Sequence, residues 1–186
     1  DTFLFSDTIG SNISFGAGDR SNRLEYNGQY DGQRRRRGYD EQYVRRMAAI
    51  AGADGFISSM PDGYDTVVGE RGVGLSGGQK QRLSLARALA DNPSILIMDD
   101  TTSAVDMETE AEIQRHLRDL DEKKTIVTIA HRISSVKDSD LILVLEHGRI
   151  VERGTHDELV ASHGRYWQIY SKQLGVDAGR SQGFEA

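Results

Sequence analysis

The most constraining feature of the sequence is an uninterrupted apolar run at residues 95–98 that ends in Asp99 and Asp100. Such a run predicts a strand buried on both faces of a parallel sheet. A helical pattern over residues 107–120 and a second apolar strand at 125–130 follow it, the latter ending before His131. Strand, helix and strand in this order predict a parallel, right-handed crossover. The polar ends of both strands are then expected along one sheet edge, where ligands bind in open α/β folds.

The first half of the chain is predicted to be mainly helical. Residues 41–51 and 80–90 carry apolar side chains at three- and four-residue steps. Between the first residues and these helices, residues 16–40 are polar and rich in glycine, which predicts a flexible loop or insertion. Its four consecutive arginines, residues 34–37, leave two interpretations open: contact with acidic lipid headgroups or RNA, or a solvated basic loop.

After the second strand, residues 141–145 predict a third strand, and His147-Gly148 predicts a two-residue hairpin turn into a fourth. Thr155 and Glu158 have the spacing of a capping box at the start of another helix.

A glycine-rich stretch precedes the helix predicted at 80–90 and reads Leu75-Ser76-Gly77-Gly78-Gln79. Ser76 and Gln79 have the spacing of a capping box. The capping interpretation does not explain the two glycines, each of which lowers helix propensity by roughly 1 kcal/mol relative to alanine. They suggest close approach of a large group to bare backbone, and an anion suits the free amides and positive dipole of a helix start.

Composition limits the functional classes. The 186 residues include 29 acidic and 23 basic ones, and this mildly acidic balance argues against nucleic acid as a general partner. The sequence has no cysteine, which excludes disulfides and cysteine-based metal sites. No apolar run approaches the roughly 20 residues that span a bilayer.

These motifs, in this order, resemble the nucleotide-binding domain of ATP-binding-cassette (ABC) transporters from residue 1 to about 174. The glycine-rich stretch at 75–79 matches the family's signature motif, and residues 95–100 match its Walker B motif. Residues 103–106 match the D-loop, and His131 matches the switch histidine. Residues 3–9 and 69–72 are similar to the exporter branch, in which membrane helices precede the nucleotide-binding domain; the resemblance implies that both stretches lie near the membrane domain.

The resemblance implies an incomplete P-loop NTPase fold of the α/β class. Residues 1–92 would form the helical subdomain, with a polar insertion at about 17–40. Residues 93–174 would form the C-terminal part of the RecA-like ATPase core, and 175–186 a flexible tail.

The same resemblance implies ATP and Mg²⁺ as cofactors. Asp99 would hold Mg²⁺ through water, Asp100 would stand at the catalytic base, and His131 would contact the γ-phosphate or position the attacking water. Leu75, Ser76, Gly77, Gly78 and Gln79 would bind nucleotide, and Asp106 would lie at the interface with a partner, although a loop-capping role is open for it.

The implied partners are a second ABC nucleotide-binding domain, in a homodimer or heterodimer, and the transmembrane domain of the same polypeptide, with no nucleic acid. The implied location is the cytoplasmic face of the inner membrane, as part of an integral membrane exporter. Two alternatives stay open: a non-hydrolysing module that only binds a partner, and an ABC ATPase without a membrane domain.

Two departures from the family pattern affect the expected mechanism. The sequence contains no G-x-x-x-x-G-K-[ST] phosphate loop, and the Q-loop glutamine would fall before Asp1. We therefore expect a fragment that lacks the front third of the domain and hydrolyses almost no ATP alone. Because sheet edge and apolar surface would be exposed, we expect it to self-associate or to be partly disordered. Asp100 stands where the family has glutamate, and with Thr101 it resembles the degenerate subunit of heterodimeric exporters; a neutral variant in a homodimer is the alternative.

Overall fold

A computed structural model describes residues 3–17, 39–69, 74–99, 104–120 and 124–175. The chain forms two compact units, residues 1–129 and 130–186. Both carry their own hydrophobic core. Among the described residues, no helix has the length and hydropathy to cross a membrane.

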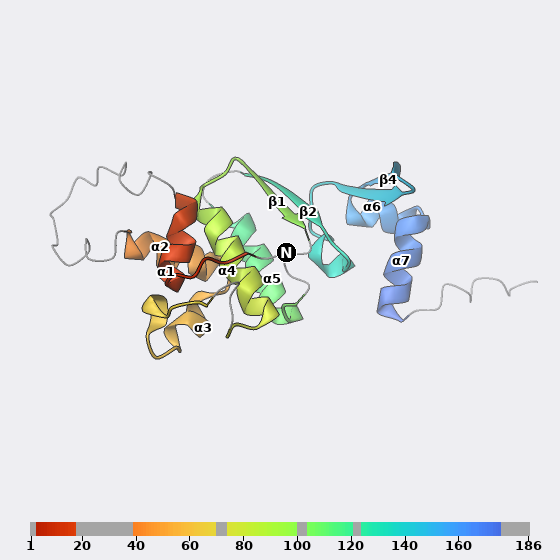
Figure 1. Ribbon diagram of the computed structural model, residues 1–186. Coiled ribbons are helices and arrows are strands. Elements are labelled where there is room, and N and C mark those ends of the chain that lie inside the picture. Colours follow the sequence, from red (N-terminus) through yellow and green to blue (C-terminus); the bar gives the residue numbers. More distant parts are fainter. Residues whose placement is uncertain (1–2, 18–38, 70–73, 100–103, 121–123, 176–186) are drawn as a thin grey trace, which may run out of the picture. The chain divides into compact units, whose positions relative to one another are not determined.

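Helices dominate the first unit, and α1, α2, α4 and α5 cluster together in Figure 1. Their bounds are α1 Ile9–Ser14, α2 Glu41–Ile50, α3 Asp54–Ser58, α4 Gly77–Ala90 and α5 Met107–Arg118. The apolar positions predicted on α4 are buried, with Leu83, Leu85 and Leu89 each no more than 3% exposed. The helical prediction for this half of the chain is therefore confirmed.

Strands β1 (Ile95–Asp99) and β2 (Thr125–Ile129) pair in parallel on either side of α5 in the sequence, as predicted. The prediction that β1 is buried on both faces is wrong. Leu96 and Met98 are buried, whereas Ile95 and Ile97 are 60% and 66% exposed. Within the described part of this unit, the helical core covers one face of the strand, and the other face remains apolar and open.

The second unit consists of a hairpin and two helices, labelled in part in Figure 1. Strands β3 (Ile142–Glu146) and β4 (Arg149–Gly154) pair antiparallel, and helices α6 (His156–Ala161) and α7 (Arg165–Leu174) follow. His147 and Gly148 have φ angles of 50° and 74°, which a two-residue hairpin turn with two positive φ angles requires. The predicted turn and the Thr155–Glu158 capping box are both confirmed.

Several predictions fall outside the described residues. They include the arginine run at 34–37, almost all of the polar insertion, Asp100 with Thr101, and the tail from residue 176. The subdomain boundary expected between residues 92 and 93 stays a prediction.

Candidate functional site

The start of α4 combines a complete capping box with exposed backbone. The Ser76 hydroxyl accepts a hydrogen bond from the Gln79 amide at 3.2 Å, and the Ser76 amide donates to the Gln79 side-chain oxygen at 2.9 Å. Ser76 and Gly77 are exposed. Because the reciprocal cap uses the amides of Ser76 and Gln79 and Gly78 is buried, the amide of the exposed Gly77 is the first-turn donor that a ligand could engage.

The two glycines differ in their surroundings. A β-carbon on Gly77 would lie 3.5 Å from the Ala104 side chain, which is an ordinary contact. At Gly78 it would lie 2.6 Å from the Ala104 carbonyl oxygen. This distance is too short for a real contact, and the oxygen belongs to the backbone, which cannot easily move aside. The anion hypothesis is therefore unnecessary for Gly78, because the close neighbour that requires glycine belongs to the same chain.

The Gln81 side chain also links α4 to the segment that begins at Ala104. The Ala104 amide donates to the Gln81 side-chain oxygen at 3.1 Å. Residues 104–106, the end of the expected D-loop, thus pack on the first two turns of α4. The sequence did not predict this contact, because residues 78 and 104 are far apart in the chain and no local pattern relates them.

Asp106 is the N-cap of α5. Its carboxylate accepts from the Thr109 amide at 2.9 Å and from the Thr109 hydroxyl at 2.8 Å. These two hydrogen bonds hold the pKa of the Asp106 carboxyl below its usual value. The capping role weighed for Asp106 is confirmed, and its role at a partner interface stays a prediction.

Arg82 lies in the turn of α4 that follows the signature stretch, and its side chain contacts residues outside the helix. It donates to the Gly52 carbonyl at 2.7 Å, and its guanidinium carbon lies 4.8 Å from the centre of the Phe56 ring. Burial lowers the pKa of Arg82, and the nearby Asp106 carboxylate opposes that shift. This arginine links α4 to the loop after α2.

Asp99 is the last residue of β1 and is exposed, opposite Ile129 in the parallel register. No group of three or more acidic or histidine side chains that would hold a metal ion occurs among the described residues. One carboxylate at a strand end is a donor set that fits Mg²⁺ with most of its water retained, and not a protein cage. The neighbouring Asp100 lies outside the described residues.

His131 belongs to the second unit and is exposed. The Gln173 side chain on α7 donates to its carbonyl oxygen at 2.9 Å and accepts from the Ile133 amide at 3.0 Å. The sequence contained no signal for Gln173, because a polar residue near the end of a helix is ordinarily solvated.

The first residues of the chain are fastened to α4 by a buried amide and an arginine. The Asn12 side chain accepts from the Phe5 amide and donates to three carbonyls, of Phe5, Asp7 and Thr8. Arg87 donates to the carbonyls of Phe3 and Asn12 and to the Asn12 side chain. The result is a firmly held segment that leaves its aromatic rings exposed.

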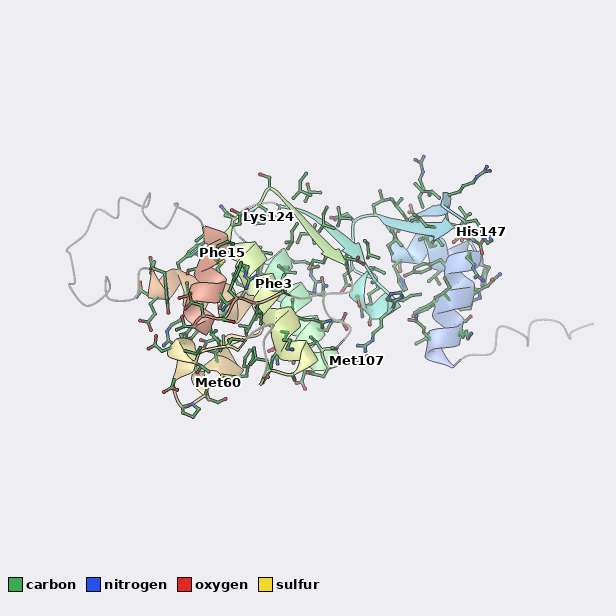
Figure 2. All side chains as sticks on the ribbon, viewed as in Figure 1. Phe3, Phe15, Met60, Met107, Lys124 and His147 are labelled. Atoms are coloured by element: carbon green, nitrogen blue, oxygen red, sulfur yellow. The ribbon has the colours of Figure 1, made fainter. Side chains whose placement is uncertain are left out.

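Three of those rings, Phe3, Phe5 and Phe15, form a contiguous aromatic group. Their centroids are separated by 5.2 Å and 4.6 Å in turn, and Phe3 and Phe15 are 55% and 65% exposed. Figure 2 shows Phe3 and Phe15 on the helical part of the first unit. Phe3 and Phe5 belong to the stretch 3–9, whose expected place near a membrane domain stays a prediction, and Phe15 lies outside that stretch.

Comparison with known proteins agrees with the motifs. A family model described as ABC transporter matches residues 10–103, and the chain belongs to that family. It is 50% identical over 173 residues to an uncharacterized ABC transporter ATP-binding protein, YknU, of Bacillus subtilis; the match covers 93% of the chain and 26% of that protein. It is 42% identical over 172 residues to the ATP-dependent lipid A-core flippase of Aliivibrio fischeri, covering 92% and 26%.

A solved structure of a bacterial Atm1-family ABC exporter with ATP bound resembles the fold with a TM-score of 0.78 and 41% identity. The match covers 93% of this chain and 27% of that one. The predicted fold class and the likeness to exporters are thereby confirmed. The chain spans about a quarter of the length of the relatives it matches.

Proposed function

We propose that this chain is the C-terminal part of the nucleotide-binding domain of an ABC exporter, and that its signature stretch binds the γ-phosphate of ATP held by a second such domain. The observation that carries the proposal is the start of α4, where Ser76 and Gly77 are exposed at the positive end of a 14-residue helix. A phosphate there gains hydrogen bonds from amides and a favourable dipole.

In this proposal, Asp99 holds Mg²⁺ through water and His131 contacts the γ-phosphate at the chain's own nucleotide. The magnesium ion neutralises charge on the phosphates when bound. Asp106 faces the partner domain from its place at the start of α5. The two nucleotide-binding domains lie at the cytoplasmic face of the inner membrane. Their ATP-dependent closure drives export through a transmembrane domain of the same polypeptide.

We further propose that the two sites of the pair are unequal. Aspartate is one methylene shorter than glutamate, and a displacement of about 1 Å in a catalytic base can reduce the rate on the order of a hundredfold. With Asp100 as its base, the chain's own site is slow, whereas its complete signature stretch serves the competent site of the partner. The described chain alone hydrolyses almost no ATP.

A charge placed at the start of α4 tests the phosphate-binding role. Gly77→Asp puts a carboxylate where the γ-phosphate is expected, and like charges within a few ångströms disfavour binding by more than about 1.4 kcal/mol, which is tenfold. The ATPase rate of the full-length transporter should fall at least about tenfold.

Gly55→Asp is the matched control. Gly55 also lies in the first turn of a helix, α3, and nothing approaches an added β-carbon there within 4 Å. Equal ATPase rates for the two variants would refute the phosphate-binding role of α4. A normal nucleotide affinity with no hydrolysis in the unmodified transporter would instead favour the non-hydrolysing module.

A further inference from the structure

The side chain of Gln173 forms a two-point clamp on the backbone around His131. Its amide nitrogen donates to the His131 carbonyl at 2.9 Å, and its oxygen accepts from the Ile133 amide at 3.0 Å. Arg132, between them, has an extended backbone with φ −113° and ψ 132°. In an extended segment the carbonyl of one residue and the amide two residues on point the same way, so one carboxamide satisfies both, as a neighbouring strand would.

The helix that carries Gln173 is itself held in place at its other end. The Glu152 carboxylate of β4 accepts from the backbone amides of Arg165 and Tyr166, the first two residues of α7. Tyr166 is 3% exposed, and its hydroxyl lies 2.7 Å from Nδ1 of His156. Gln173 therefore extends from a helix with a fixed position in the second unit.

The backbone downstream of His131 is anchored too. Ile133 is 7% exposed and belongs to the core of the second unit, and its amide is the one that Gln173 engages. The His131 side chain is exposed, so packing does not set its direction. The peptide geometry at residues 131–133 sets the direction of its Cα–Cβ bond instead.

We propose that Gln173 is a positioning residue for His131. By fixing the 131–133 backbone, it aims the imidazole toward the phosphate that the switch histidine contacts. The inference rests on the proposed function, because it requires His131 to act on nucleotide. Gln173 itself touches no substrate.

The test uses the full-length transporter with Asp100→Glu as background, so that the base at this chain's own site matches the family pattern. Gln173→Ala removes both hydrogen bonds. We expect kcat for ATP to fall about tenfold, because small losses of positioning are costly in rate, with KM changed less than about twofold. Gln173→Glu keeps the acceptor for Ile133 but sets a carboxylate oxygen against the His131 carbonyl oxygen, so its kcat should also fall below that of the Asp100→Glu background.

Gln168→Ala is the control on the same helix. Gln168 is an exposed glutamine of α7 whose side-chain oxygen accepts from Arg165 at 3.2 Å, away from His131. It should leave kcat unchanged. Amide exchange in residues 131–134 should rise in Gln173→Ala and stay unchanged in Gln168→Ala.

A double-mutant cycle separates positioning from general stability. If Gln173 acts through His131, then Gln173→Ala lowers kcat no further once His131→Ala is present, whereas independent effects would multiply. Full kcat in Gln173→Ala, or multiplicative effects in the cycle, would overturn the inference. An unchanged rate in His131→Ala would instead overturn the proposed role of His131. If Gln173→Ala lowers thermal stability, the same double-mutant cycle with His131→Ala is measured with Gln173→Glu in its place.

Discussion

We predict that Arg87 provides most of the free energy that holds the first residues of the chain against α4. Its Nε donates to the Asn12 carbonyl at 2.8 Å, Nη1 to the Phe3 carbonyl at 2.9 Å, and Nη2 to the Asn12 side-chain oxygen at 2.6 Å. The guanidinium carbon also lies 5.1 Å from the centre of the Phe5 ring. Burial lowers the pKa of Arg87, because desolvation opposes the charged form of the guanidinium.

The magnitude follows from these contacts. Three hydrogen bonds from a charged, half-buried donor contribute about 1 kcal/mol each after desolvation, and the ring contact adds about 0.5 kcal/mol. Arg87→Met keeps the aliphatic stem and removes these contacts, so the free energy of opening residues 3–16 should fall by about 3.5 kcal/mol. That corresponds to roughly three-hundredfold faster amide exchange in this segment, when exchange follows the opening equilibrium.

Arg45→Met is the matched comparison, measured in the same exchange experiment. Arg45 also stands over an aromatic ring, 4.7 Å from the centre of Tyr64, and it pairs with Glu41 at 3.0 Å. The Arg45 and Glu41 side chains are 46% and 38% exposed, so solvent screens the pair. The free energy of opening should therefore fall by less than about 1 kcal/mol in Arg45→Met, or about fivefold in exchange. If exchange in residues 3–16 is unchanged in Arg87→Met, or changes equally in both variants, then Arg87 does not hold the segment.

Three further predictions concern the nucleotide site, the second unit and the exposed apolar face of β1 and β2. Asp100→Glu in the assembled transporter should raise the ATPase rate or shorten nucleotide occlusion, and no change in either would remove support for unequal sites. Burial, with a smaller contribution from Tyr170, raises the pKa of Tyr166 to about 12. A pKa raised on folding gives stability that is complete below the unfolded value, near 10, and is lost as pH rises to about 12. Thermal unfolding followed by the fluorescence of the single tryptophan, Trp167, should show this loss, and Tyr166→Phe should abolish it. The described chain by itself should self-associate through the apolar face of β1 and β2, and a monomer at high concentration in light scattering would contradict this.

Local chemistry allowed much of the fold to be predicted. The two capping boxes, the His147-Gly148 turn and the buried stripe of α4 each depend on residues a few positions apart, and each is confirmed. The error at β1 has a different origin. An apolar run has the same appearance whether helices cover one face of a strand or both, so periodicity could not distinguish these cases.

The contacts that organise the candidate site lie beyond local pattern. Gly78 meets Ala104 across 26 residues of sequence, and Arg87 reaches Asn12 across 75. Gln173 reaches His131 across 42. In each case a glycine, an arginine or a glutamine has several ordinary roles in isolation, and only the tertiary structure selects one of them. The motifs predicted the candidate site residues, and the structure identifies the distant residues whose contacts fix their positions.

The two signature glycines have separate physical reasons, and the difference bears on how a shared site would work. Gly77 is exposed and leaves its amide accessible, whereas Gly78 lets the Ala104 backbone pack against α4. Because the Ala104 amide also donates to the Gln81 side chain, the signature stretch and residues 104–106 are held together within the first unit. Asp106, at the end of that segment, is fixed by its cap on α5. A partner domain that contacted either stretch would therefore meet both in a fixed arrangement, which is a condition for one phosphate-binding surface to be completed between two chains.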